Sequence, residues 1–394
     1  MGQREVVVVA GVRTGIGDYG GALKDIPATQ LGATAIRAVV DRAGIDPARV
    51  GHVVMGSVIH GEARDMYLSR VAAMDAGLAV GTPCLTVNRL CGSGLQAIVS
   101  AAQHILLGDT DTVIGGGAES MSRAAYFLPA GRWGQRMGDG AVVDAMTGAL
   151  HDPFGHGHMG ITAENIAARY GITREEQDAY ALESHHRAAR ANAAGYFVSQ
   201  ITPIALKSKQ GPVAYTADEH VRPNAKIEDL QKLKAVFKKE GTVTAGNASG
   251  LNDAGAAIMM MEATAALQAG VQPMARLVAY AHAGVQPEVM GLGPIPAVRE
   301  VFRKSGLKPA DMDVVESNEA FAVQAMAVTR DLELDPAQVN PNGGAVALGH
   351  PIGATGAVLT VKALYELQRV QKRYALVTMC IGGGQGIAAI FERM

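Results

Sequence analysis

Apolar residues along this chain occur in two alternating patterns, short unbroken runs and longer stretches with helical spacing. An unbroken apolar run at residues 6–10 predicts a buried strand that Gly11 is expected to end, and residues 50–55 predict a second strand. Residues 31–39 and 95–106 carry apolar side chains at helical spacing and predict amphipathic helices. The alternation of strands with helices predicts βαβ units in a mostly parallel sheet.

Two further predicted strands lead into glycine-rich segments. Residues 86–90 end at Cys91 and a Gly-Ser-Gly turn, whereas residues 112–114 end at a glycine triplet, 115–117. Glycine at such positions allows tight turns and the close approach of a backbone or ligand. Both segments are therefore candidate parts of a site.

Features of the first half recur in the same order in the second half. Pro309 stands 262 positions after Pro47, and Gly356 stands 262 positions after Gly94. A second glycine triplet lies 267 positions after the first one and follows a predicted strand at 374–379. Repeats at a nearly constant offset indicate two copies of one α/β unit.

The segment between the two copies has a different character. Thr173 and Glu176 form a capping box that predicts the start of a helix, and Gly195 is a plausible end for it. Residues 203–240 are rich in lysine. This stretch is either a solvated face or an electrostatic rim for a phosphorylated ligand.

Composition restricts the class of protein. Hydrophobic residues make up 48% of the 394 positions and charged residues only 18%, which excludes a disordered chain. The net charge of −2 provides no field for nucleic acid, and the apolar runs are too short to span a membrane. Three cysteines and no signal-peptide pattern predict a cytoplasmic protein without a disulfide framework.

Four chemically reactive or polar residues follow predicted strands. Cys91 lies where a strand meets a helix, and the helix dipole there can lower the pKa of a thiol. The alternative is that Cys91 is an ordinary buried residue. His350 occupies a glycine-rich loop suited to a general base, Cys380 precedes the second triplet, and Asn318 follows a strand at 314–315. Sheets of this type place sites at such strand ends.

Two other patterns predict no site. The dinucleotide motif G-x-G-x-x-G fails at both glycine triplets because Ser120 and Ile387 occupy the third glycine position. The histidines at 151, 156 and 158 and Asp152 resemble metal ligands, but no second cluster or regular spacing accompanies them. No metal is predicted.

Taken together, the glycine-rich and cysteine-containing segments resemble the thiolase family, acyl-CoA C-acyltransferases that make or cleave 3-ketoacyl-CoA. The resemblance extends over the whole chain. Within the family, the sequence is most similar to bacterial biosynthetic β-ketothiolases of broad specificity that supply polyhydroxyalkanoate synthesis. The motifs that carry it, in the order of the family, are G-V-R-T (11–14), T-V-N-R-L-C-G-S-G (86–94), G-G-G-A-E-S-M-S (115–122), H-M-G (158–160), G-N-A-S-G-L-N-D (246–253), N-E-A-F-A (318–322), G-H-P-I-G (349–353) and C-I-G-G-G (380–384).

The resemblance implies an α/β protein with the layered αβαβα fold, built from two duplicated halves and an inserted loop domain. The N-terminal half would comprise residues 1–120 plus 249–270, and the C-terminal half residues 271–394. Residues 121–248 would form the loop domain that covers the CoA. A homotetramer, arranged as a dimer of dimers, is also implied.

The resemblance further implies a reversible ping-pong Claisen reaction through an acyl-Cys91 intermediate. His350 would activate Cys91, and Cys380 would move the C2 proton of the second acyl-CoA. One oxyanion site would use His350 and a water held by Asn318. The other would use the N–H groups of Cys91 and Gly382.

Acyl-CoA and CoA are the implied ligands, as substrates and products, and no separate cofactor, nucleic acid or membrane partner is implied. Ser249, Arg222 and the loop domain would hold the nucleotide and pantetheine, and a methionine-lined pocket would hold the acyl chain. The implied binding residues are Ser249, His158, Arg222, Phe237, Ala245, Met159, Met290, Leu150, Ala320 and Phe321.

Three alternatives remain open from the sequence: a degradative 3-ketoacyl-CoA thiolase, a decarboxylating ketoacyl synthase, and a non-catalytic scaffold or lipid carrier. The second Cys in the glycine-rich loop argues against a ketoacyl synthase, and retention of all four reactive positions argues against a scaffold. Val323 and Met326 depart from the usual family residues. These two positions leave the substrate range open.

Overall fold

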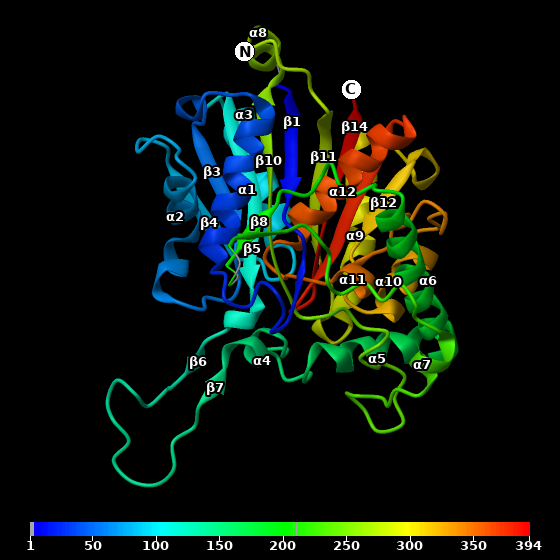
Figure 1. The fold of residues 1–394 in the computed structure, drawn as a ribbon. Helices are drawn as coiled ribbons and strands as arrows, with labels where there is room; N and C mark the ends of the chain where they lie inside the picture. The colour runs from blue at the N-terminus through cyan, green and yellow to red at the C-terminus, as the bar shows by residue number, and fades with distance from the viewer. Residues whose placement is uncertain (1–3, 208, 210) are drawn as a thin grey trace.

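The computed structural model describes residues 4–207, 209 and 211–394. The parts of the predicted domains at positions 1–3, 208 and 210 lie outside the described residues. The centre of the molecule is a ten-stranded sheet in the order β12-β13-β14-β11-β1-β10-β5-β3-β4, with β2 paired to β10 (Figure 1). Its strands are β1 (Val6–Arg13), β2 (Gly17–Asp18), β3 (His52–Gly56), β4 (Cys84–Val87), β5 (Thr112–Ser120), β10 (Asn252–Glu262), β11 (Ala275–Gly284), β12 (Val314–Ser317), β13 (Tyr374–Ile381) and β14 (Gln385–Arg393).

Two halves of the sheet mirror each other. The order β3-β5-β10-β1 on one side corresponds to β12-β13-β14-β11 on the other. The halves join where β1 pairs with β11 over only two residue pairs, Val7 with Arg276 and Val8 with Ala275. This symmetric order agrees with the duplication that the repeats predict.

Helices form three layers around the two halves of the sheet. α3 and α12 lie between the halves, and their apolar side chains share one core with residues of β1, β5, β10, β13 and β14. α1 and α2 cover the outer face of the first half, and α9 and α10 that of the second. The αβαβα layering is therefore confirmed. The helices are α1 (Ala28–Ala43), α2 (Leu68–Asp75), α3 (Ser93–Leu107), α8 (Ala263–Gln268), α9 (Pro294–Ser305), α10 (Ala322–Asp331), α11 (Ala345–Leu348) and α12 (Thr355–Val370).

The two central helices touch at their N-termini. A Cβ on Gly94 would lie 2.8 Å from the backbone nitrogen of Ala357, and one on Gly356 would lie 2.2 Å from that of Leu95. Only glycine allows this approach. The contact brings the loops that precede the two helices, one with Cys91 and one with His350, to the same place.

The sheet is mixed, so the expectation of a mostly parallel sheet is wrong. Only the pairings of β3 with β4, β3 with β5 and β12 with β13 are parallel. β10 and β14 run antiparallel to their neighbours. In the second half the reason is local, since a three-glycine turn joins β13 directly to β14 and a short turn forces a hairpin.

Glycines that were expected to end strands lie inside them. Gly11 pairs with Ile258 within β1, where a Cβ would only reach ordinary contact with Ile258 and Val361. The triplet 115–117 belongs to β5. A Cβ on Gly117 would lie 2.2 Å from the Gly353 carbonyl oxygen, so the glycines serve close packing and not a turn.

Other predicted boundaries shift by a few residues. The strand expected at 50–55 is β3 (His52–Gly56), and the one expected at 86–90 is β4 (Cys84–Val87). β13 continues past the predicted end to Ile381, so Cys380 lies inside the strand. The helix with the capping box is confirmed as α6 (Arg174–Ala193), because Thr173 and Glu176 each accept a backbone N–H.

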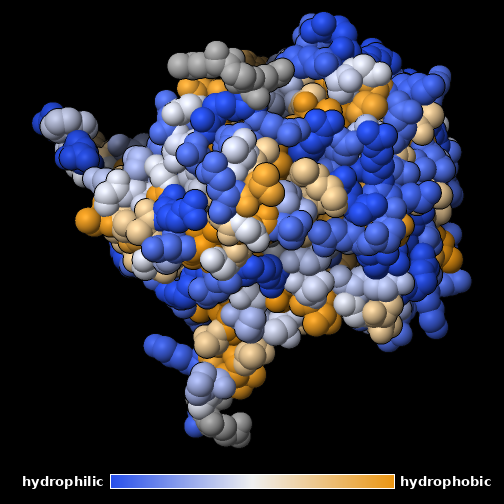
Figure 2. Space-filling model, turned by 90° about the horizontal axis from the view of Figure 1, so that it is seen from above, coloured by the Kyte–Doolittle hydropathy of each residue, from blue (hydrophilic) through white to orange (hydrophobic). Residues whose placement is uncertain are grey.

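Part of residues 121–248 lies beyond one end of the sheet, where a long segment between β6 (Tyr126–Phe127) and β7 (Val143–Asp144) reaches away from the body (Figure 1). The rest lies alongside the body, with α6 beside the sheet and Ile204 in the same core as α1. The opposite end, seen from above in Figure 2, is mainly hydrophilic with small separate apolar patches. The elements of this part are β6 (Tyr126–Phe127), β7 (Val143–Asp144), α4 (Ala145–Ala149), α5 (Met159–Tyr170), α6 (Arg174–Ala193), β8 (Ile204–Leu206), β9 (Val213–Tyr215) and α7 (Ile227–Gln231).

One described helix is apolar and long enough, by length and composition, to cross a membrane. It comprises the window 90–107, essentially α3, and 56% of that window is buried inside the molecule. α3 is the central helix of the core, packed against β3, β5 and α12. Its apolar character is explained by that position.

Candidate active site

A cavity of about 420 Å³ lies where the loops before α3 and α12 meet the segment 145–251. Twelve of the fifteen predicted site residues line it; Asn318, Cys380 and Arg222 do not. The structure thus gathers residues that are far apart in the sequence, and their roles stay predictions. The twelve are Cys91, Leu150, His158, Met159, Phe237, Ala245, Ser249, Met290, Ala320, Phe321, His350 and Gly382.

Cys91 is held by a tight and strained loop. Leu90, immediately before it, has a φ of 45°, in the left-handed region that non-glycine residues adopt at a cost of about 1–3 kcal/mol. The Ser93 hydroxyl donates to the Leu90 carbonyl at 2.6 Å and accepts the Arg89 N–H at 2.8 Å. These contacts fix the Cys91 side chain at the wall of the cavity.

The pKa of the Cys91 thiol is raised, which contradicts the expectation from the helix dipole. Burial raises this pKa, and the nearby Glu119 carboxylate acts in the same direction. Backbone N–H groups of Gly382 and Cys91 lower it without overcoming burial. Cys91 is therefore a thiol at neutral pH and needs a base in order to react.

This pKa predicts how Cys91 reacts with an alkylating reagent. We expect its alkylation by iodoacetamide to accelerate continuously from pH 7 to pH 10, because the thiolate fraction grows over that range. Mass spectrometry of the Cys91 peptide measures the rate, and the Cys84 peptide serves as the reference thiol. A rate that levels off below pH 7 would show a lowered pKa and contradict the burial argument.

His350 presents a bare nitrogen to the cavity. Thr355 has one hydroxyl proton and donates it to the Pro351 carbonyl at 2.9 Å, so the His350 Nδ1–H donates to the Thr355 oxygen at 2.7 Å. This contact leaves Nε2 without a proton. Burial also lowers the pKa of His350 to about 4, which keeps the ring neutral at physiological pH. Both features suit a general base.

The backbone of His350 is fixed by Asn252. The Asn252 side-chain oxygen accepts the His350 N–H at 2.8 Å. Gly349 has a φ of 104°, and a Cβ there would lie 2.4 Å from Asn252 Cγ. Glycine before the histidine is therefore required both by the backbone conformation and by the space that Asn252 fills.

A buried carboxylate supports the same loop from the other side. Glu119 accepts backbone N–H groups of Val58 and Ile59, each at 3.1 Å, and of Gly353 at 2.8 Å. Burial raises the pKa of Glu119 to about 8 although these donors oppose the shift. The residue ties the first half of the molecule to the His350 loop.

Asn318 lies behind the cavity wall, fully buried, directly after β12. Its Nδ2 lies 3.4 Å from His350 Nε2, and its Oδ1 finds no hydrogen-bond donor among the described residues. A buried amide oxygen without a partner is the kind of group that holds an ordered water. The position fits the predicted water-binding role.

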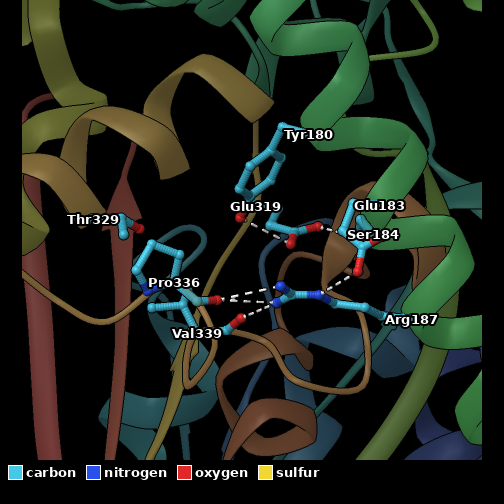
Figure 3. Close-up of a pocket in the computed structure, with 8 residues that line it drawn as sticks. All are labelled: Tyr180, Glu183, Ser184, Arg187, Glu319, Thr329, Pro336 and Val339. Atoms are coloured by element: carbon cyan, nitrogen blue, oxygen red, sulfur yellow. Dashed lines mark hydrogen bonds and ion pairs between the residues drawn. The ribbon is translucent and has the colours of Figure 1, made fainter. Parts of the chain in front are cut away.

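Glu319, next to Asn318, is the centre of a polar cluster (Figure 3). The Ser184 and Tyr180 hydroxyls donate to it at 2.7 and 3.1 Å, and both come from α6. The Asn340 amide and the Val346 N–H complete its partners. Since Val346 belongs to α11, just before Gly349, one carboxylate links α6 to both Asn318 and His350.

Cys380 is fully buried beneath Cys91 near the end of β13. Burial and the neighbouring Cys91 raise the pKa of its thiol. Gly382, two residues after Cys380, donates its N–H to the Cys91 sulfur. A Cβ on Gly382 would lie 3.1 Å from Met159 and 3.2 Å from Leu90, so glycine keeps this side of the cavity open.

The predicted binding residues form the apolar part of the cavity. His158 stacks on Phe237 with ring centroids 4.6 Å apart, and Phe237 meets Phe321 edge-on. Burial lowers the pKa of His158, so this ring is neutral. Val323 and Met326 pack in the core behind this wall and do not line the cavity.

Arg222 lies in a neighbouring pocket of about 600 Å³. The two pockets share His220 and Ala245, and Lys226 lies beside Arg222 in the second one. Part of the lysine-rich stretch therefore faces a pocket, whereas Lys232 pairs with Asp229 at the surface. The shared residues show that the two pockets adjoin each other.

Several residues of the site were not predicted from the sequence. His220, Thr355 and Glu119 are single polar residues outside the cysteine and histidine motifs, although Glu119 stands in G-G-G-A-E-S. Leu90 and Met121 read as ordinary apolar residues. Among the described residues, no group of three or more His, Cys, Asp or Glu side chains suits a metal ion.

Comparison with known proteins agrees with the geometry. The models of the thiolase N-terminal domain and C-terminal domain match residues 6–264 and 271–393. Beta-ketothiolase BktB of Cupriavidus necator is 64% identical over 99% of this chain and 100% of its own, and an acetyl-CoA acetyltransferase of Chromobacterium violaceum is 49% identical over the same shares. Human mitochondrial 3-ketoacyl-CoA thiolase in complex with CoA superposes with a TM-score of 0.97 at 44% identity, covering 100% and 98% of the two chains. The chain belongs to the thiolase family.

Proposed function

We propose that this protein is a β-ketothiolase that catalyses the reversible reaction of two acyl-CoA molecules to 3-ketoacyl-CoA and CoA, with acetyl-CoA and short acyl-CoA as substrates. The observation that carries the proposal is that Cys91 and His350 line one cavity, while Asn318 contacts His350 and Cys380 neighbours Cys91 behind the cavity wall.

In the direction of thiolysis, Cys91 attacks the C3 carbonyl of 3-ketoacyl-CoA, and its proton passes to Nε2 of His350. A carbon–sulfur bond forms, and the C2–C3 bond breaks. The departing acetyl-CoA enolate takes a proton at C2 from Cys380. The raised pKa of Cys380 supports this step, because the sulfur carries a proton when the substrate binds.

In the second half-reaction, CoA attacks the acyl-Cys91 thioester. The proton of the CoA thiol passes to the leaving Cys91 sulfur, and acyl-CoA is released. The proton held by His350 returns to Cys380, which restores both thiols. Condensation uses the same steps in reverse, with Cys380 receiving the C2 proton.

Two sets of donors would stabilise the negative oxygen atoms. The Gly382 N–H already points at the Cys91 sulfur and, with that of Cys91, would receive the oxygen of the tetrahedral intermediate. Protonated His350 and a water on Asn318 would receive the enolate oxygen. Donors placed in advance contribute most in a buried site such as this one.

The pocket with Arg222 would hold the anionic nucleotide of CoA, and the apolar cavity beside Cys91 would hold the pantetheine and the acyl chain. Arg222 and Lys226 provide the positive charge. Met159 and Met290 suit acyl chains of different length, because a methionine side chain adapts its shape.

The assay that tests the proposal is CoA-dependent consumption of acetoacetyl-CoA and of 3-ketovaleryl-CoA. Comparable turnover of both would support the broad β-ketothiolase, and turnover of acetoacetyl-CoA alone would restrict it to the short-chain enzyme. Preference for longer 3-ketoacyl-CoA would favour the degradative thiolase. Lack of turnover with all three would overturn the proposal.

The homotetramer is part of the same proposal. The segment between β6 and β7 projects from the body and exposes 87% of Trp133 and 91% of Met137, which a second copy would cover. We expect the double change Trp133→Ser and Met137→Ser to reduce the assembly from four chains to two, measured by light scattering. A variant that stays tetrameric would remove this segment from the interface.

A further inference from the structure

One acidic residue stands between the nucleotide pocket and the catalytic histidine. Asp18 belongs to the short strand β2 and pairs in register with Asn252 of β10. Its Oδ1 accepts His220 Nδ1 at 2.5 Å and Asn252 Nδ2 at 3.3 Å, and its Oδ2 accepts from the Arg222 guanidinium at 3.4 Å. A single carboxylate thus contacts three residues of the site.

Each of these partners has a separate connection to the site. His220 lines both pockets and Arg222 lines the nucleotide pocket. Asn252 is fully buried and accepts the His350 N–H through its own oxygen at 2.8 Å. A continuous path of side chains therefore runs from Arg222 through Asp18 and Asn252 to the backbone of His350.

The negative charge of Asp18 is the unexpected feature of this path. A pocket that receives the 3′-phosphate and diphosphate of CoA gains from positive charge, yet Asp18 neutralises part of Arg222. Arg222 is 61% exposed at its side chain, so the pair is open to exchange with a ligand phosphate. The carboxylate and the phosphate compete for one guanidinium.

We propose that Asp18 is a positioning residue with two separable effects: it restrains Arg222 against the 3′-phosphate of CoA, and it supports His350 through Asn252. The first effect weakens CoA binding and so favours its release. The second keeps the catalytic base in place. The inference rests on the proposed CoA site and adds a residue that tunes it.

Two variants separate the effects. Asp18→Asn keeps one oxygen for His220 and Asn252 but replaces the acceptor of Arg222 by an NH₂ group. We expect the KM for CoA in thiolysis to fall about threefold, which corresponds to the free energy of an exposed ion pair. We expect kcat to fall no more than about twofold, because the hydrogen bonds to His220 and Asn252 remain. Asp18→Ala loses all three contacts and leaves the Asn252 amide only its bond to the Gly17 carbonyl at 3.1 Å, and we expect kcat to fall about tenfold as well.

Dephospho-CoA, which lacks the 3′-phosphate, is the matched ligand, and Asp229→Asn is the matched variant. Asp229 lines the same pocket but pairs with Lys232 instead of Arg222. We expect the KM for dephospho-CoA to be the same in wild type and Asp18→Asn, and the KM for CoA to fall less in Asp229→Asn than in Asp18→Asn.

Three results would overturn the inference: a raised KM for CoA in Asp18→Asn, an equal fall with dephospho-CoA or in Asp229→Asn, or an undiminished kcat in Asp18→Ala. Arg222→Ala tests the underlying site on its own. If its KM for CoA matches that of wild type, the nucleotide assignment fails, whatever Asp18 does.

Discussion

Replacing Cys91 by alanine should reduce thiolysis of acetoacetyl-CoA by about 10⁴-fold or more, since no covalent intermediate can form without the nucleophile. No other described residue stands in its place: Cys380 is fully buried, and the Cys91 sulfur is the one to which Gly382 donates. The change removes a single sulfur atom from the cavity wall. Turnover in a coupled CoA assay and the intact mass after incubation with acetyl-CoA measure the two consequences.

Cys84→Ala is the matched control for this variant. Cys84 lies on the edge strand β4, partly buried and outside the cavity, so its removal should leave both turnover and acetylation of the protein in place. Acetylation that persists in Cys91→Ala would identify another nucleophile and contradict the proposed mechanism. Loss of activity in Cys84→Ala would instead show that the assay responds to damage of the fold.

The main residues of the site could be predicted from the sequence because each one stands in an unusual local setting. Cys91, Asn318 and Cys380 occur at or just after the ends of strands, and His350 occurs in a loop with too many glycines for a regular element. The duplication explains why these separate loops meet. Gly94 and Gly356 hold equivalent places in the two copies, and their contact brings the loops before α3 and α12 together.

The residues that support the site could not be predicted in this way. Asp18 and Asn252 are 234 positions apart, and Glu119 and Gly353 also 234, so nothing local in the sequence links them. Asp, Asn and Thr are common at turns and caps, and their residue type gives no signal. Only the fold shows that Asn252 and Glu119 accept N–H groups from the loop of His350 and that Asp18 contacts Asn252.

The predicted lowering of the Cys91 pKa was wrong because the effect of the helix dipole is smaller than the cost of burial. A helix N-terminus favours an anion by about 0.3–1 kcal/mol, whereas removing a charged group from water without full compensation costs several times more. The sequence reveals the helix start, but not that the thiol is enclosed. The same limit applies to the sheet, since the pattern of apolar runs does not distinguish parallel from antiparallel neighbours.

Replacing Cys380 by serine should separate the two half-reactions. A hydroxyl is close in size to a thiol but a far weaker acid, so it cannot supply the C2 proton to the departing enolate or exchange it in the reverse direction. We expect thiolysis of acetoacetyl-CoA to fall by about 10³-fold. Acetylation of Cys91 uses only Cys91 and His350, so exchange of labelled CoA into acetyl-CoA should stay within about tenfold of wild type.

Deuterium exchange at C2 of acetyl-CoA gives the decisive comparison, because it reports proton movement without carbon–carbon chemistry. Wild type should exchange this proton, and Cys380→Ser should not, while both exchange CoA. If the variant loses CoA exchange instead, Cys380 takes part in acylation and the division of roles between the two thiols is wrong. If the variant keeps C2 exchange, Cys380 does not move this proton. Another group near the enolate then moves it, and His350 is the nearest candidate.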